Sequence, residues 1–385
     1  MRTLIPVLMA VVLDLVGFGI VIPLLTFYAL EYGAGPVEVT LLMAVYSLAQ
    51  FLMAPVWGAL SDRYGRRPIM LFSIAMASIC LAGFAWADSL LLLFVFRTLH
   101  GAAAANISTA QACVADVTSA ENRAKGMGLI GAAFGFGFTI GPFIGGELSV
   151  VSLSTPIWVA AGLSALNFVL AVFLLKETRD PNTERPTRSI HPKAFIQAMR
   201  HPVIGMCIAL TFVMTLAFAA MESSFTLFAE EVRGLDARSV GRMFGVAGLT
   251  MIVVQGGLIG RLVKRFGEAP LVPIGVTLLA VSLAILPFAP PPRWMTIVFV
   301  IMAIGQGIAS PSLHSLISKG AGPHEQGFVL GTNQSMSALA RAVGPSIAGY
   351  VYLVGPAMPF FMSSAVLTLS IGLSILAIRQ RRKAA

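Results

Sequence analysis

Apolar runs of roughly 20 residues follow one another along almost the whole chain, and this recurrence limits the fold more than any other feature. Of the 385 residues, 57% are hydrophobic and 11% are charged, whereas soluble domains carry about 25% charged residues. The mean hydropathy is +0.86. A helix of about 20 apolar residues crosses the hydrocarbon core of a bilayer. The sequence therefore predicts an all-α membrane protein with many spans.

Twelve transmembrane helices are predicted from these runs. The first run contains Asp14 and is longer than the apolar core of a signal peptide, about 7–15 residues, so we expect it to be retained as a span. The segment 176–202 is rich in proline and charge, and it predicts a cytoplasmic linker between two six-helix halves, 1–175 and 203–385. The predicted spans are 4–30, 39–58, 68–87, 90–113, 126–148, 155–175, 203–228, 239–260, 270–289, 294–318, 326–352 and 358–378.

The distribution of Lys and Arg predicts the orientation in the membrane. If the N-terminus is cytoplasmic, 20 of the 26 Lys and Arg fall in cytoplasmic segments, as the positive-inside rule favours. The net charge of +9 is then a feature of topology and does not indicate nucleic-acid binding. We expect a multi-pass protein of the cell (inner) membrane with both termini cytoplasmic. The basic residues outside these segments are Arg97 and Arg341, within spans, and Arg233, Arg238, Arg242 and Arg293, on the outer side.

Two pairs of similar segments indicate an internal duplication. GALSDRYGRRP at 58–68 and GRLVKRFGEAP at 260–270 share Gly, Leu, Arg, Gly and Pro at the same offsets, 202 residues apart. GPFIGG at 141–146 and GPSIAG at 344–349 are 203 residues apart, and both lie in the fifth span of their half. Matches at nearly one separation predict two copies of a six-helix unit that point the same way in the membrane.

Four motifs carry a resemblance to a known family. They are GALSDRYGRRP (58–68), RTLHG (97–101), GFTIGPFIGG (137–146) and DLVGFGIVIPLL (14–25). Together they resemble signatures of the major facilitator superfamily, in particular its proton-driven drug antiporter branch, and the chain as a whole resembles tetracycline efflux proteins. The resemblance implies two pseudo-symmetric six-helix halves, alternating access to a central cavity, and no cofactor. It does not specify the substrate.

Ionisable residues within the predicted spans are candidates for proton coupling. Asp14 lies about ten residues into the first span, where a lone carboxylate is costly and could exchange a proton as its surroundings alternate between wet and dry. Arg97 keeps its proton, but the family resemblance links it to coupling. Glu222 in span seven and His314 in span ten are further candidates. Each of these residues could instead be a structural group paired with a neighbouring helix.

A second set of polar residues within the spans is assigned to substrate binding. Amides and cations in lipid are costly unless they bond across helices, so they either hold helices together or line a cavity. No metal-ligand spacing, nucleotide-binding P-loop or hydrolase motif occurs in the sequence, so we expect no metal, no direct use of ATP and no enzyme activity. The residues assigned to substrate binding are Asp14, Gln306, Asn333, Gln334 and Arg341.

The loop 58–68 is assigned to gating. The resemblance suggests a latch, in which Asp62 and its neighbouring arginines bridge to helix ends and hold the inner gate closed. The positive-inside rule alone would account for the arginines, but not for Asp62 or for the two glycines. The residues of this loop that we assign to gating are Gly58, Asp62, Arg63, Gly65, Arg66 and Arg67.

The fifth span is also assigned to gating. Gly137, Gly141 and Gly145 repeat every four residues and leave one helix face without side chains. Pro142 removes a backbone hydrogen bond and bends the helix. We expect this smooth face to seal the joint between the halves, and ordinary close packing is the alternative.

The sequence thus predicts a secondary active transporter, a proton-coupled antiporter that exports amphipathic drugs or metabolites. Its partners would be a small-molecule substrate, protons and the lipid bilayer, with no nucleic acid, and it would act as a monomer. The acidic residues alone would also permit proton symport, and the cargo could be a sugar, an organic acid or a metal chelate. A non-transporting sensor or assembly protein on the same scaffold would need an added recognition surface, which the short loops do not provide.

Overall fold

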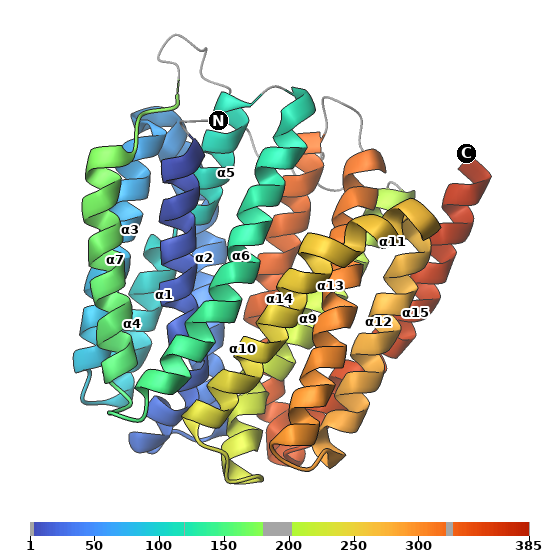
Figure 1. Cartoon of the computed structure of the whole chain (residues 1–385). Helices are drawn as coiled ribbons and strands as arrows, with labels where there is room; N and C mark the ends of the chain where they lie inside the picture. Colours follow the sequence, from blue (N-terminus) through green and yellow to red (C-terminus); the bar gives the residue numbers. More distant parts are fainter. Residues whose placement is uncertain (1–3, 119, 180–201, 321–325, 385) are drawn as a thin grey trace. The chain divides into compact units, whose positions relative to one another are not determined.

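The computed structural model describes residues 4–118, 120–179, 202–320 and 326–384, and helices dominate these residues (Figure 1). Most of the predicted linker 176–202 lies outside the described residues. The helices of the first half are α1 (Leu4–Glu31), α2 (Pro36–Tyr64), α3 (Arg66–Trp86), α4 (Leu90–Ala103), α5 (Asn106–Val117), α6 (Ala120–Leu148) and α7 (Thr155–Leu174). Those of the second half are α9 (Pro202–Glu231), α10 (Ala237–Val253), the π-helical turn η1 (Val254–Leu258), α11 (Ile259–Phe266), α12 (Glu268–Ile285), the 3₁₀ turn η2 (Leu286–Phe288), α13 (Arg293–Gly320), α14 (Gln326–Val354) and α15 (Met358–Ala384).

The predicted all-α membrane fold is confirmed. Among the described residues, ten helical segments are long and apolar enough to cross a membrane. The eleventh predicted span corresponds to α14, which has 29 residues but a more polar composition. The twelfth corresponds to α15, whose described side chains form an apolar segment over Met358–Gly372.

The fourth predicted span, 90–113, is confirmed as a candidate membrane span, but its helix is interrupted. It is not one continuous helix, because α4 ends at Ala103 and α5 begins at Asn106. The pair extends to Val117, and together the two helices form one candidate span of 28 residues, Leu90–Val117. Hydropathy does not reveal such a break, because the run as a whole is apolar enough to be a candidate span.

The contacts among the residues divide the chain into two units. Unit 1 comprises residues 1–35, 45–188 and 236–245. Unit 2 comprises residues 36–44, 189–235 and 246–385. Each unit therefore includes the N-terminal end of one helix from the other half of the sequence, α10 in unit 1 and α2 in unit 2.

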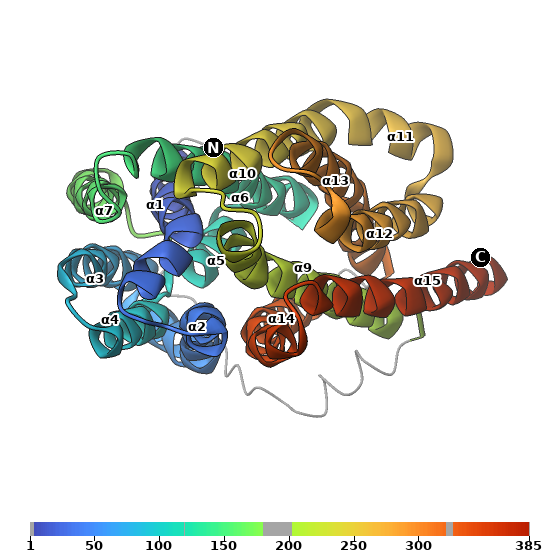
Figure 2. The ribbon, with the colours of Figure 1, turned by 90° about the horizontal axis from the view of Figure 1, so that it is seen from below.

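Unit 1 is built around α1, which packs against α5, α6 and α7, while α3 packs against α4, α5 and α7 (Figure 2). Val7, Val11 and Leu15 recur every four residues and form a buried stripe on α1. Met70 of α3 and Val114 of α5 belong to the same buried cluster. In lipid, such close packing is itself a main source of helix association.

Unit 2 is built around α9 and α12. Helix α9 packs against α13, α14 and α15, and helix α12 packs against α13 and α15. Small residues bring the backbones together: a Cβ atom at Gly275 of α12 would lie 2.6 Å from the carbonyl oxygen of Gly305 on α13. This approach requires glycine, because any side chain at Gly275 would overlap the facing backbone.

Candidate functional site

Asp14, the first candidate for proton coupling, lies on α1 and faces the beginning of α5. Its carboxylate interacts with the side-chain amide of Asn106, the first residue of α5. Asn106 is 3% exposed, and neither of its side-chain polar atoms has a hydrogen bond of normal geometry among the described residues. The partner of this half-buried acid is thus a neutral amide, which does not neutralise the negative charge.

Arg97 lies on α4 within a cluster of aromatic rings of unit 1. Its guanidinium carbon is 4.7 Å from the centre of the Tyr46 ring and 5.8 Å from that of Phe18. The Tyr46 ring is in turn 5.1 Å from both Phe18 and His100. A cation over aromatic faces gains about 0.5–2 kcal/mol, and most where water is excluded.

Phe18 connects this cluster to Asp14. The two residues are four positions apart on α1, so they lie on the same helix face. The structure therefore brings Arg97 to the Phe18 ring, one helical turn from Asp14 on α1 of unit 1. The sequence did not reveal that Tyr46 belongs to this region, because an aromatic residue in an apolar span is a core residue by default.

The candidates of the second half lie in unit 2. Glu222 of α9 interacts electrostatically with Arg341 of α14, a helix that packs against α9. One carboxylate oxygen of Glu222, Oε1, is buried without a hydrogen-bond partner among the described residues. The acid of unit 2 thus has a cation beside it, in contrast to Asp14.

The four amide and imidazole candidates of unit 2 differ in burial. Asn333 is 1% exposed and its side-chain oxygen has no hydrogen-bond partner within the described part of the chain. The same holds for the oxygen of the half-buried Gln306, and Gln334 is also half-buried. His314 is exposed, and its Nδ1 lies 2.9 Å from the carbonyl oxygen of Ser310 one turn earlier. His314 is therefore satisfied by its own helix.

The glycine face of α6 packs against α1, and not at the joint between the halves as expected. A Cβ atom would lie 2.6 Å from Leu15 Cβ if placed at Gly137, and 2.6 Å from Gly19 Cα if placed at Gly141. At Gly145 it would lie 2.5 Å from the carbonyl oxygen of Ile20. The smooth face thus joins two helices of the first half.

A different face of α6 meets the N-terminal end of α10 within unit 1. A Cβ atom at Gly241 of α10 would lie 2.5 Å from the carbonyl oxygen of Pro142. At the end of α6, Glu147 forms ion pairs with Arg238 at 2.8 Å and Arg242 at 2.5 Å. The contact of α6 with the second half of the sequence is thus made by Pro142, by the final residues of α6 and by two arginines.

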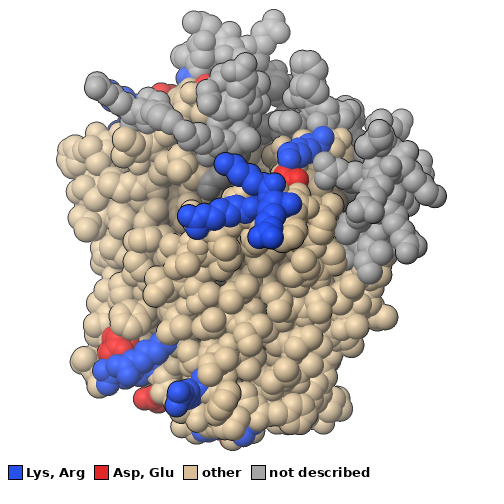
Figure 3. Space-filling model, turned by 45° about the vertical axis from the view of Figure 1, so that its right-hand side comes forward, with Lys and Arg blue, Asp and Glu red and all other residues tan. Residues whose placement is uncertain are grey.

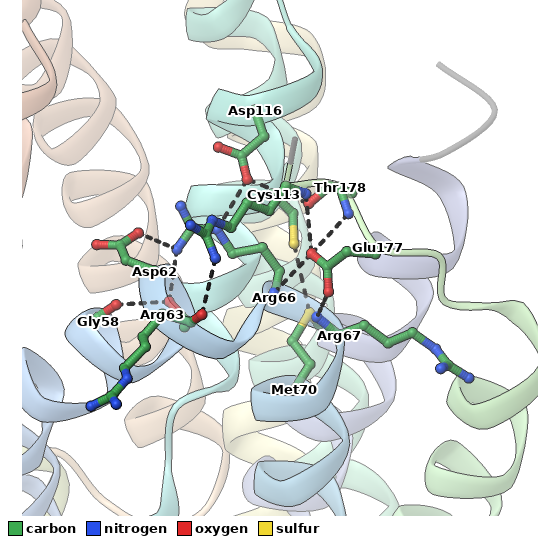
Figure 4. Close-up of polar contacts among 12 residues, drawn as sticks. Gly58, Asp62, Arg63, Arg66, Arg67, Met70, Cys113, Asp116, Glu177 and Thr178 are labelled. Carbon is green, nitrogen blue, oxygen red and sulfur yellow. Dashed lines mark hydrogen bonds and ion pairs between the residues drawn. The ribbon is translucent and has the colours of Figure 1, made fainter. Parts of the chain in front are cut away.

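The loop 58–68 forms a network of polar contacts centred on Arg66 (Figure 4). Its guanidinium contacts Asp62 at 2.5 Å, Asp116 of α5 at 3.0 Å and the Ser61 hydroxyl at 2.8 Å. Arg67 donates to the carbonyl of Val172 on α7 at 2.7 Å. These contacts tie α2, α3, α5 and α7 together at one end of unit 1.

The remaining residues assigned to this loop have smaller roles in the network. The carbonyl of Gly58 accepts a hydrogen bond from the Ser61 hydroxyl at 2.9 Å. Arg63 is exposed with its guanidinium over the Tyr64 ring, and its carbonyl accepts from Arg179 at 3.0 Å.

Glu177 caps the N-terminus of α3. The backbone N–H groups of Arg66 and Arg67 donate to its two carboxylate oxygens at 2.9 and 3.1 Å. Partial burial works against ionisation, but backbone donors from Arg66, Arg179, Arg67 and Thr178 outweigh it and hold the pKa of Glu177 below its ordinary value. A carboxylate at a helix N-terminus is also favoured by the helix dipole.

Gly65 is required at this cap for two reasons. Its φ of +103° lies in the region that residues with a side chain rarely adopt. In addition, a Cβ atom there would fall within the contact distance of the Glu177 carboxylate, so any other residue would displace the cap.

The second copy of the loop, 260–270, has a simpler arrangement. Glu268, the first residue of α12, pairs with Lys319 at the end of α13 and accepts from the Ser315 hydroxyl at 3.0 Å. Gly267 has a φ of +75°, but nothing lies within 4 Å of the position of a Cβ atom. On the face drawn in Figure 3, Lys and Arg gather towards two ends with a band of uncharged side chains between them.

Asp116 and Glu177 were not identified from the sequence, although two signals point to them. Both are carboxylates in segments where the predicted topology favours cations. Asp116 also lies 203 residues before Lys319, at the separation of the internal repeat. Asn106 had no comparable signal, because its importance depends on the break between α4 and α5.

Comparisons with known proteins agree on one family. The family model of the Major Facilitator Superfamily matches residues 7–345 and, a second time, residues 257–384. The tetracycline resistance protein, class C, of Escherichia coli is 33% identical over 363 residues, which cover 91% of this chain and 90% of that protein. Multidrug resistance protein 2 of Bacillus subtilis (strain 168) is 28% identical over 380 residues, which cover 96% and 93%.

A solved structure supports the same assignment. The crystal structure of the human organic anion transporter MFSD10 (TETRAN) is 26% identical and has a TM-score of 0.76, over 97% of this chain and 99% of that one. The chain therefore belongs to the major facilitator superfamily.

Proposed function

We propose that this major facilitator transporter exports small amphipathic molecules in exchange for protons. The observation that carries the proposal is the environment of Asp14, a carboxylate between membrane helices whose partner is the neutral amide of Asn106. An ionised carboxylate is costly in such surroundings. A proton, or a substrate that brings a compensating group, can remove this cost, and the two would therefore compete for Asp14.

The exchange cycle follows from this competition. When Asp14 is accessible from the outside, where protons are more concentrated, it takes a proton and releases the substrate. When it is accessible from the cytoplasm, it loses the proton and can bind the next substrate molecule. We place both termini in the cytoplasm of a cell with an inner membrane, and we propose that a single copy of the chain performs the cycle.

The names of the relatives support efflux as the direction. They include proteins of tetracycline resistance and of multidrug resistance, and resistance by a membrane transporter requires outward movement. A substrate of this kind is amphipathic, in keeping with the aromatic rings around Arg97. Arg97 would keep this region positive whichever state Asp14 is in.

The residues of unit 2 would take further parts of the same task. Glu222 has Arg341 beside it, so we propose that it is a secondary acid that tunes the coupling. The side-chain oxygens of Gln306 and Asn333 lack hydrogen-bond partners among the described residues, which suits contact with a substrate, and we keep Gln334 with them. His314 bonds to its own helix and remains a candidate for proton transfer.

We also propose that two sets of contacts act as gates: the network around Arg66, and the contacts between α6 and α10. Opening towards the cytoplasm would require rearrangement of the network of Asp62, Arg66 and Asp116. The α6 contacts of Pro142 and Glu147 with α10 would have to change in the opposite step. Gly137, Gly141 and Gly145 would keep α6 fixed on α1 during both steps, because their contacts leave no room for a side chain.

Transport in vesicles tests the proposal. Purified protein in liposomes should accumulate tetracycline or ethidium when the pH gradient is imposed in the direction that drives exchange, and collapse of the gradient should stop accumulation. Asp14→Asn should abolish gradient-driven transport. Asp236→Asn is the matched control. Asp236 is exposed just before the start of α10, and its carboxylate accepts a local hydrogen bond from the backbone N–H of Ser239 at 2.9 Å.

The outcome also separates the alternatives. Movement of substrate in the same direction as the protons would identify a symporter. Transport that continues unchanged without a gradient, or in the Asp14→Asn variant, would contradict the proposal. A protein that moves neither probe nor protons would favour a sensor on the same scaffold.

A further inference from the structure

The break between α4 and α5 lies in the middle of a candidate membrane span. Α helix of 14 residues precedes it and one of 12 residues follows it. In the apolar interior, backbone groups released by such a break must find other partners, and irregular backbone at this depth occurs where it is buried in protein or lines a cavity. In other transporters, interrupted helices commonly form the binding site.

Side chains from two other helices support the break. Trp57 of α2 donates its indole N–H to the carbonyl of Ala102 at 2.6 Å. The backbone N–H of Ala105 donates to the hydroxyl of Ser73 on α3 at 3.0 Å. Two backbone groups at the break thus bond to specific side chains, which indicates that the break is a built feature of unit 1.

Two polar side chains at the break are buried without such partners. Asn106 is 3% exposed and Thr109 is 1% exposed. The hydroxyl of Thr109 lacks a hydrogen-bond partner among the described residues, and the Asn106 amide has only its interaction with Asp14, which falls short of normal hydrogen-bond geometry. The two residues are three positions apart, so they lie on the same face of α5. Buried polar atoms are almost always satisfied in folded proteins, so two adjacent exceptions require an explanation.

We propose that this break is a hydrogen-bonding subsite, in which Asn106 and Thr109 bind neutral oxygen-bearing groups of the substrate, such as hydroxyl, enol or amide groups. The subsite rests on the proposed function, since it assumes a small-molecule cargo. An amide offers donors and an acceptor, and a hydroxyl offers one donor and acceptor lone pairs. Such a pair matches groups that can both donate and accept, and it has no charge with which to select an ion.

The position of Asn106 links the subsite to Asp14. Asn106 interacts with the Asp14 carboxylate, so a substrate group that recruits the Asn106 amide takes it away from Asp14. Occupancy of the subsite and the charge state of Asp14 are then coupled through one side chain. Substrate would be selected by Asn106 and Thr109, whereas the proton would be carried by Asp14.

Equilibrium binding to the purified protein tests the subsite with two probes. Tetracycline carries hydroxyl, enol and amide groups, and tetraphenylphosphonium is an apolar cation without hydrogen-bonding groups. Thr109→Val and Asn106→Leu should each weaken tetracycline binding by about tenfold, the effect of losing roughly 1.4 kcal/mol. Binding of tetraphenylphosphonium should stay within twofold, and Thr109→Ser should restore tetracycline binding.

Equal weakening for both probes would show that these residues only support the structure, and unchanged tetracycline binding would show that they do not contact the substrate. Either result overturns the subsite. A wild-type protein that binds neither probe would contradict the proposed function, and the subsite would then be decided by the next measurement.

Thermal unfolding without any substrate provides that measurement. Thr109→Val removes a hydroxyl that has no partner, so the melting temperature should stay unchanged or rise. Ser73→Ala is the control, because it removes one of the two acceptors of the buried Ala105 N–H and leaves only the carbonyl of Ala103, and its melting temperature should fall. A fall in the Thr109→Val variant as large as that of Ser73→Ala would mean that Thr109 is a structural residue, which would contradict the subsite.

Discussion

The loops 58–68 and 260–270 occupy equivalent positions in the internal repeat, but opposite charges hold them together. In the first loop Arg66 pairs with Asp116, and in the second Glu268 pairs with Lys319. The two pairs are related residue by residue at separations of 202 and 203. The duplication has thus kept the place of an ion pair between the start of one helix and the end of another, while its polarity has reversed.

The surroundings of the two pairs differ as well. The side chain of Arg66 is 9% exposed and has two carboxylate partners, whereas that of Lys319 is 56% exposed and has one. Breaking a buried ion pair costs about 3–5 kcal/mol, while an exposed pair contributes about 0–1 kcal/mol. We therefore expect the first loop to be a structural network and the second to be a weak contact at the same position.

Removal of the central cation should have the largest effect on stability. Arg66→Met leaves the carboxylates of Asp62 and Asp116 facing each other without a counter-charge, and we expect a loss of about 3 kcal/mol. The measurement is thermal unfolding in detergent, with Lys319→Met as the matched control at the equivalent pair. A loss in Lys319→Met as large as that in Arg66→Met would contradict the difference between the loops.

Reversal of each pair sharpens the comparison. The double variant Glu268→Lys with Lys319→Glu should keep nearly all of its stability, because the pair has no other charged partner among the described residues. The double variant Arg66→Glu with Asp116→Lys should be strongly destabilised, because it places a new carboxylate beside Asp62. Equal tolerance of both reversals would show that the first network adds nothing to its central pair.

The sequence revealed the positions in this comparison but not all of the partners. Hydropathy predicts the spans, and the repeat aligns Arg66 with Glu268. Neither hydropathy nor the repeat predicts that Glu177, which follows α7, caps the N-terminus of α3, since this contact joins residues 110 or more positions apart. The glycines of α6 were recognised as a smooth face, but a sequence cannot show which helix covers such a face. The break before Asn106 was missed because its support comes from Trp57 and Ser73 on other helices.

The glycines that precede α3 and α12 should differ in their tolerance of a side chain. Gly65→Ala combines an unfavourable backbone conformation, about 1–2 kcal/mol, with displacement of Glu177. Gly267→Ala should cost only the backbone term, because its surroundings are open. Thermal unfolding of the two variants checks this. The comparison would fail if both lost the same stability, or if Glu177→Ala did not reduce the penalty of Gly65→Ala.

Glu177 should make a smaller, pH-dependent contribution. Its pKa is lowered in the folded protein, so it stabilises the fold above its unfolded pKa of about 4.3, and the benefit disappears as the pH falls through the folded pKa. Glu177→Gln should cost about 0.3–1 kcal/mol at neutral pH and nothing below the folded pKa. Melting temperatures across this range check the sign, and a deficit that grows towards acid pH would contradict it.

The carboxylates within the membrane spans of the two units also differ in their partners. Asp14 of unit 1 has the neutral Asn106 as its partner, whereas Glu222 of unit 2 has the cation Arg341 beside it. A nearby cation reduces the cost of an ionised carboxylate in the membrane, whereas a neutral amide supplies no opposite charge. We therefore expect coupling to depend mainly on Asp14, with Glu222 in a secondary role.

Proton release on substrate binding tests this expectation most directly. When tetracycline is added to the purified protein in weakly buffered detergent solution, the wild type should release protons in proportion to the substrate bound. Glu222→Gln should keep most of this release, and Asp14→Asn should lose it while still folding. Full release from Asp14→Asn, together with its loss in Glu222→Gln, would contradict the central claim that substrate and proton compete for Asp14.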